Sequence, residues 1–140
     1  MRFLSVGMGG IFGALARYAV SLLLNDKGLL PWGTFAVNVA GCFFIALFLT
    51  LVLHKLSGQS FFVLAVATGF IGSFTTFSTL SVEGIVLFQS SALLALLYLG
   101  LTLLGGLVFT WFGYAAGQYI LTTGWGERWI GLSAKGERNG

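Results

Sequence analysis

The residues of this chain that could do chemistry gather in one short apolar stretch. Within residues 73–81, six of nine side chains are serine or threonine, and the carboxylate of Glu83 follows. Phe74, Phe77 and Leu80 fill the gaps three residues apart, which places them on roughly one face of a helix. Hydroxyl groups in such number can satisfy backbone groups freed by a broken helix or replace water around a small ion. The edge of a phenyl ring is electropositive and can face an anion without binding it too tightly to leave.

Two glycines, Gly69 and Gly72, precede this hydroxyl run. Glycine weakens a helix, so the stretch predicts a helix that is discontinuous near its middle. Non-helical backbone at membrane depth occurs only where it is buried in protein or lines a watery cavity. Such breaks present carbonyls to cations and helix N-termini to anions. The stretch therefore predicts an ion site or an ion pathway.

Further polar groups lie in other apolar runs. Thr34 and Asn38 are four residues apart and share one helix face. The Asn38 amide either forms a hydrogen bond between helices or donates its NH2 group to an anion in a pore. Arg17 and Glu83 are charges within predicted spans, where charges are costly and usually functional. The alternative for Arg17 is a side chain that reaches the membrane interface, and for Glu83 a solvated helix end.

Enzymatic chemistry is not indicated. The chain has one cysteine, Cys42, and one histidine, His54. These exclude an internal disulfide and offer too few ligands for a side-chain metal site. The sequence shows no plausible Ser-His-Asp or Cys-His set and no nucleotide-binding fingerprint. We expect neither an enzyme nor a nucleic-acid-binding protein.

The elements that must position these residues are membrane helices. Hydrophobic residues make up 57% of the 140 residues and charged residues 8%, with a mean hydropathy of +0.96, whereas a soluble domain carries about 25% charged residues. A span needs about 20 apolar residues, and runs of that length cover about residues 3–24, 33–53, 61–88 and 92–122. The prediction is an all-α membrane protein with four transmembrane helices in one domain, 1–124, and a polar, mobile tail, 125–140.

Two other architectures are disfavoured. The first run has Arg2 and "ALA" at residues 14–16, as a cleaved signal peptide can have, but the apolar run resumes after Arg17 and completes a span. Transmembrane β-strands alternate apolar and polar residues, and these runs do not.

Glycines four residues apart predict close helix packing. Gly9 with Gly13, and Gly113 with Gly117, form two such pairs, which let helix backbones approach each other within one subunit or between subunits. Because four short helices enclose little interior, we expect an oligomer.

Three motifs occur in order along the chain: GGIFGALARY at residues 9–18, GTFAVNVAG at 33–41 and GFIGSFTTFST at 69–79. Together they resemble the Fluc, or CrcB, family of fluoride channels, from the first predicted helix to the fourth. The resemblance implies an antiparallel (dual-topology) homodimer with two pores, each lined by both subunits. It also implies passive export of fluoride from the cytoplasm across the cell (inner) membrane, with strong rejection of chloride, which lowers fluoride toxicity.

The resemblance also assigns residues to roles. The backbone carbonyls of Gly72 and Thr75 would hold a structural sodium ion (Na+) at the dimer centre. The fluoride pathway would comprise a pore phenylalanine, a pore asparagine with the threonine on its helix face, the first-helix arginine and a polar track: Phe77, Asn38, Thr34, Arg17, Ser78, Thr79, Glu83, Tyr98 and Thr102. Leu80 stands where many relatives have a second phenylalanine, so either the pore works with one phenyl per subunit at this position or conduction is slower. Gly106 stands where a relative can carry serine, so the polar track is expected to be shorter. We predict that Leu80→Phe keeps or raises fluoride conduction.

The charge distribution does not favour a dual topology. In a four-span chain the N-terminus, second loop and tail share one side, which carries Arg2, Lys55, Arg128, Lys135 and Arg138, whereas the other side carries Lys27. The positive-inside rule would place both termini in the cytoplasm. The antiparallel arrangement therefore rests on the resemblance.

Two rival functions remain as alternatives. A small four-helix, proton-coupled multidrug exporter would need a membrane-embedded carboxylate in the first helix, whose only charge is Arg17. A non-transporting membrane assembly subunit would suit the glycine pairs but leaves the hydroxyl run unexplained.

Overall fold

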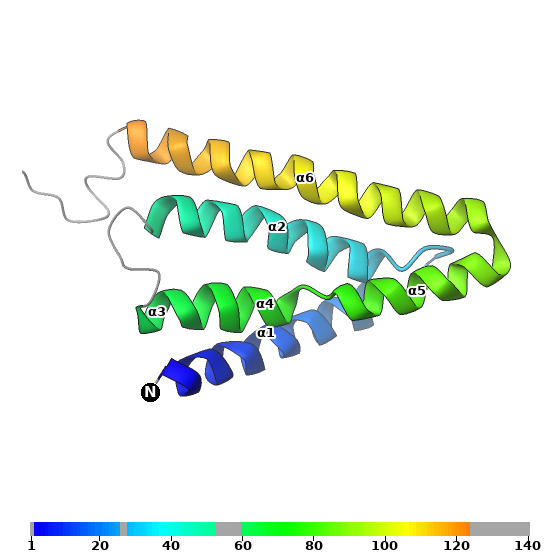
Figure 1. The fold of residues 1–140 in the computed structure, drawn as a ribbon, viewed down its shortest axis with the longest axis horizontal. Coiled ribbons are helices and arrows are strands. Elements are labelled where there is room, and N and C mark those ends of the chain that lie inside the picture. The colour runs from blue at the N-terminus through cyan, green and yellow to red at the C-terminus, as the bar shows by residue number, and fades with distance from the viewer. Residues whose placement is uncertain (1, 26–27, 53–59, 124–140) are drawn as a thin grey trace, which may run out of the picture.

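Four spans make up the described part of the chain, residues 2–25, 28–52 and 60–123 of a computed structural model (Figure 1). They are α1 (Arg2–Leu24), α2 (Trp32–Val52), a third span over Phe61–Ser90 and α6 (Ala92–Thr122). All four are long and apolar enough to cross a membrane, which confirms the prediction of four transmembrane helices. Their ends lie within two residues of the predicted ones. The predicted domain boundary at 124 and the tail 125–140 lie outside the described residues.

The third span is assembled from several short pieces. They are α3 (Phe61–Val63), the π-helix η2 (Leu64–Ile71), α4 (Gly72–Phe74), two extended residues and α5 (Phe77–Ser90). Side chains cap the start of α3 and the start of α5: the Ser60 hydroxyl accepts a hydrogen bond from the Val63 N–H at 3.2 Å, and the Thr76 hydroxyl accepts one from the Thr79 N–H at 3.1 Å. Capping is needed because the first N–H groups of a helix have no intrahelical partner.

The helices pack in pairs. α6 lies along α2, and α1 lies against η2 and α4, while α5 returns to contact α6 (Figure 1). At the start of α2, the Gly33 N–H donates to Asn25 Oδ1 at 2.7 Å. These contacts place the middle of the third span against α2.

The paired glycines are where helix backbones meet. A β-carbon at Gly113 would collide with the Phe43 carbonyl, and one at Gly117 would lie 2.7 Å from Thr50 Cγ2, both on α2. On α1, a β-carbon at Gly13 would collide with the carbonyl of Phe70 in η2. Both glycine pairs thus pack helices within one subunit, which is the first of the two predicted alternatives.

Large apolar side chains are exposed over much of the molecule. Phe3, Leu104 and Trp111 are more than 60% exposed, at 93%, 63% and 63%, as expected where lipid and not water is the solvent. The 31 residues of α6 give a helix of about 46 Å, longer than a hydrocarbon core of about 30 Å. This helix must therefore tilt in the membrane or extend beyond the hydrocarbon.

Candidate functional site

The third span leaves the helical conformation at Thr75 and Thr76. Thr75 has φ −76° and ψ 156°, and Thr76 has φ −149° and ψ 118°, both extended. The span is therefore broken near its middle, as predicted. Gly69 lies in η2 and Gly72 begins α4, so the break comes three residues after the second glycine. Gly69 serves the close approach of α1 instead, because a β-carbon there would lie 2.6 Å from the Val6 carbonyl oxygen.

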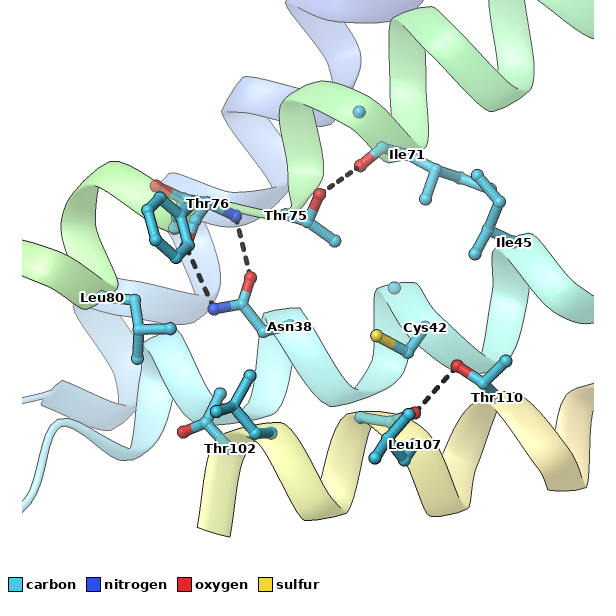
Figure 2. Close-up of a pocket in the computed structure, with 15 residues that line it drawn as sticks. Asn38, Cys42, Ile45, Ile71, Thr75, Thr76, Leu80, Thr102, Leu107 and Thr110 are labelled. Carbon is cyan, nitrogen blue, oxygen red and sulfur yellow. Dashed lines mark hydrogen bonds between the residues drawn. The ribbon is translucent and has the colours of Figure 1, made fainter. Parts of the chain in front are cut away.

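Asn38 on α2 holds both backbone polar groups of Thr76. The Thr76 N–H donates to Asn38 Oδ1 at 2.8 Å, and Asn38 Nδ2 donates to the Thr76 carbonyl at 3.1 Å (Figure 2). The two bonds imitate the pairing of neighbouring β-strands. An amide nitrogen carries two N–H groups, and this structure assigns a partner to one of them.

The Thr76 hydroxyl organises the start of α5. It accepts from the Thr79 N–H at 3.1 Å, as an N-cap residue does, and donates to Thr79 Oγ1 at 2.9 Å. Ser78 Oγ lies 3.3 Å away. Thr75 and Ser81 differ, because each donates to the carbonyl four residues earlier, Thr75 to Ile71 at the end of η2 and Ser81 to Phe77 in α5. The hydroxyl run is thus divided between a cluster at the break and ordinary intrahelical bonds.

Because of these bonds, the N–H groups of Thr76 and Thr79 do not bond to the carbonyls of Gly72 and Thr75. In a continuous helix the Thr76 N–H would bond to the Gly72 carbonyl and the Thr79 N–H to the Thr75 carbonyl. Here those N–H groups point to Asn38 and to the Thr76 hydroxyl. The carbonyls of Gly72 and Thr75 are thereby left for another partner, which fits the oxygen ligands that a hard cation prefers.

A second polar cluster joins three helices around Glu83 of α5. Thr34 Oγ1 of α2 donates to Glu83 Oε1 at 2.8 Å, and Tyr98 of α6 donates its hydroxyl to Glu83 Oε2 at 2.7 Å. Thr34 and Tyr98 are buried, at 1% and 2% exposure. Thr102 is also buried and bonds to the Tyr98 carbonyl at 2.8 Å. Glu83 is therefore a bonded group inside the bundle and not only a solvated helix end.

An open groove of about 620 Å³ runs beside the break, and residues of α2, of the third span and of α6 line it (Figure 2). Its polar lining comes from Asn38, Thr75, Thr76, Thr102 and Thr110, and the rest is mainly apolar: Gly41, Cys42, Ile45, Ile71, Gly72, Phe77, Leu80, Leu103, Gly106 and Leu107.

Two lining residues differ in exposure. Phe77 is 79% exposed, whereas Leu80 is 6% exposed. Phe74, expected on the same face, does not line the groove and stacks on Phe70 with ring centroids 6.0 Å apart. The break explains why Phe74 does not share the face of Phe77 and Leu80, because Phe74 belongs to α4 and the other two residues belong to α5.

Arg17 lies one turn after Gly13 on α1, the turn that contacts η2. Gly13 meets the Phe70 backbone and Gly10 approaches the Ser73 hydroxyl, so continuing the helix by one turn brings Arg17 level with the break. Among residues 2–25, 28–52 and 60–123, the Arg17 side chain forms no hydrogen bond or ion pair.

The predicted residues thus fall into two connected groups. Asn38, Ser78 and Thr79 contact Thr76 at the break. Thr34 and Tyr98 bond to the Glu83 carboxylate, and Thr102 bonds to Tyr98. Sequence reasoning missed Thr76, the residue that both Asn38 and Thr79 contact. Its signal was available, since threonine is a preferred N-cap residue at the start of a helix.

Comparison with known proteins finds one matching family and several relatives of similar length. The family model "CrcB-like protein, Camphor Resistance (CrcB)" matches residues 4–114. A fluoride-specific ion channel FluC of Bacillus anthracis is 43% identical over 123 residues, covering 85% of this chain and 89% of the relative. A fluoride-specific ion channel FluC of Acidobacterium capsulatum is 40% identical over 124 residues, covering 86% and 99%. One of Geobacillus kaustophilus is 40% identical over 121 residues, covering 84% and 94%.

Four long apolar spans point to a multi-pass membrane protein, and the relatives' printed name assigns the family to the ion channels. The chain belongs to the CrcB family, the Fluc ion channels, and is not an enzyme.

Proposed function

We propose that this chain forms a fluoride-selective channel in the cell (inner) membrane, through which fluoride leaves the cytoplasm down its electrochemical gradient. The carrying observation is the break at Thr75–Thr76, which brings hydroxyl and amide groups to membrane depth beside an apolar groove. The relatives' printed name, fluoride-specific ion channel, supports the choice of ion. A passive route suffices because hydrogen fluoride, a weak acid, enters neutral and ionises in a less acidic cytoplasm.

Fluoride suits this site because it is small and strongly hydrated. Hydroxyl and amide donors can replace its water, whereas a larger chloride ion fits a narrow polar path poorly. Phe77 is the exposed phenyl that would present its positive edge. The second N–H of Asn38 and the hydroxyls of Ser78 and Thr79 are the donors beside it.

The proposed path continues through the Glu83 cluster. Thr34 and Tyr98 bond to that carboxylate, and Thr102 bonds to the Tyr98 carbonyl. Tyr98 and Thr34 offer hydroxyl donors that an arriving anion can compete for. Leu80 lines the groove without a positive edge, and Arg17, level with the break, supplies an attractive charge for an anion.

The assembly we propose is an antiparallel homodimer in lipid with two pores, each lined by both subunits. The open groove and the 79% exposure of Phe77 support a second copy as the missing wall. Labelling of single cysteines introduced near each end of α6, with a membrane-impermeant reagent in intact cells, tests the orientation. Equal labelling of both ends is expected, and labelling of one end alone would contradict dual topology.

A sodium ion at the dimer centre is part of the same proposal. The carbonyls of Gly72 and Thr75 fit it, because their helical donors are redirected to Asn38 and the Thr76 hydroxyl. Two subunits related by a twofold axis would supply four such oxygens. The ion would supply a fixed positive charge that holds the two breaks together.

Fluoride efflux tests the function. The purified protein is reconstituted in liposomes loaded with potassium fluoride, and a fluoride electrode measures the fluoride that is released. A potassium ionophore lets K+ leave with the fluoride, so that no membrane potential builds up. Liposomes loaded with potassium chloride are measured in parallel. We expect fast fluoride loss and negligible chloride loss. Equal loss of both ions would contradict selectivity. Transport that requires a pH gradient and is abolished by Glu83→Gln would indicate the proton-coupled exporter.

A further inference from the structure

The contact between Asn38 and Thr76 is more than a hydrogen bond between two helices. One side chain bonds to both the N–H and the carbonyl of a single residue, and that residue is the extended one before α5. We propose that Asn38 is a positioning residue that holds the third span in its broken form and so directs the Gly72 and Thr75 carbonyls. The part that concerns those carbonyls rests on the proposed sodium site.

The competing state is a continuous helix through residues 72–79. In that state the Thr76 N–H would return to the Gly72 carbonyl and the Thr79 N–H to the Thr75 carbonyl. Asn38 Oδ1 and the Thr76 hydroxyl offer these two donors other acceptors, at 2.8 Å and 3.1 Å. The two substitutes therefore stabilise the break, because without them it would leave N–H groups unbonded in the bundle.

Asparagine meets a specific requirement at this position. Its amide carries a donor and an acceptor side by side, which a two-point contact with backbone needs. Aspartate retains only the acceptor, and alanine retains neither.

Neighbouring contacts on α2 bring the amide within reach of the break. Gly41 lies three residues later on the same face, and a β-carbon there would collide with the Thr75 side chain. The absence of a side chain at Gly41 lets α2 approach Thr75 closely. Val37 and Val39 are buried, at 1% and 6% exposure, which fixes the backbone on both sides of Asn38.

Hydrogen–deuterium exchange of the purified full chain tests the contact directly. In Asn38→Ala, the amide of Thr76 loses its acceptor, so a peptide containing it should exchange at least about tenfold faster. Asn38→Asp keeps the acceptor for the Thr76 N–H but loses the donor to the Thr76 carbonyl, so its exchange should be slower than that of Asn38→Ala. Thr50→Val is the control, because Thr50 lies about 18 Å along α2 from Asn38 and bonds only within its helix. Wild-type exchange together with wild-type sodium dependence in Asn38→Ala, or exchange in Asn38→Asp as fast as in Asn38→Ala, would overturn the proposal.

A sodium titration of thermal stability is the second readout. If Asn38 directs the carbonyls, the sodium concentration for half-maximal stabilisation should rise about tenfold in Asn38→Ala, corresponding to 1.4 kcal/mol, and not in Thr50→Val. An Asn38→Ala protein with slower fluoride efflux but wild-type exchange and sodium dependence would show a fluoride donor only and overturn the positioning role. If sodium stabilises none of the proteins, the sodium site is wrong, and exchange alone decides whether Asn38 holds the break.

Discussion

Substituting Gly13 by alanine tests how the third span is held against α1. A β-carbon there would lie 2.9 Å from the Phe70 carbonyl carbon and 3.1 Å from Phe70 Cα, and it would collide with the carbonyl oxygen. Ordinary carbon contacts are about 3.5–4.0 Å. The obstacle is backbone, which cannot rotate away, so α1 must move outward by about 0.6 Å or more. Such overpacking costs about 1–3 kcal/mol.

Gly7→Ala on the same helix is the matched control, because nothing lies within 4 Å of its added carbon. Both substitutions gain the same helix propensity, up to about 1 kcal/mol, so their difference isolates the crowding. Unfolding by a denaturing detergent in mixed micelles should show Gly13→Ala less stable than Gly7→Ala by about 1–3 kcal/mol. Equal stability would refute the packing assignment. If Gly13→Ala lowered only the fraction of protein that is dimeric, and not the stability of the subunit, this glycine pair would pack between subunits.

Five further substitutions test the groove and the two polar clusters. Leu80→Phe should keep or raise fluoride efflux, because Leu80 borders an open groove of about 620 Å³; a clear loss would show that Leu80 is wrongly placed in the pathway. Tyr98→Phe and Thr34→Val each remove one donor to Glu83 and should each cost about 0.6–1.7 kcal/mol of unfolding free energy, with non-additivity in the double variant. Thr76→Val should cost about 0.5–2 kcal/mol through loss of the α5 cap, while Thr76→Ser, which keeps the hydroxyl, should unfold at wild-type detergent concentration.

Much of the fold follows from the sequence because a membrane imposes a simple rule. Apolar runs long enough to span must be helical, so hydropathy alone placed all four spans within two residues of their ends. The third span was also expected to break, since hydroxyls are dense there. The cause was misplaced, because Gly69 and Gly72 were expected to break the helix and instead lie in η2 and α4.

The site was less predictable, since its contacts join distant parts of the chain. Asn38 and Thr76 are 38 residues apart, and Thr34 and Glu83 are 49 apart. Local pattern shows that Thr34 and Asn38 share a face, but not which partner that face meets. That depends on how closely α2 approaches the break, which the collision of a Gly41 β-carbon with Thr75 reveals only in three dimensions.

The central claim, that fluoride passes the hydroxyl cluster at the break, is tested most directly by fluoride efflux from liposomes holding Thr79→Val. The substitution keeps the shape of the side chain and removes the hydroxyl that Thr76 contacts. Ser90→Ala at the exposed end of α5 is the control. We predict that wild type and Ser90→Ala release fluoride rapidly and that folded Thr79→Val is at least about tenfold slower, the factor that loss of about 1.4 kcal/mol corresponds to. Equal efflux from all three proteins would contradict passage along this cluster.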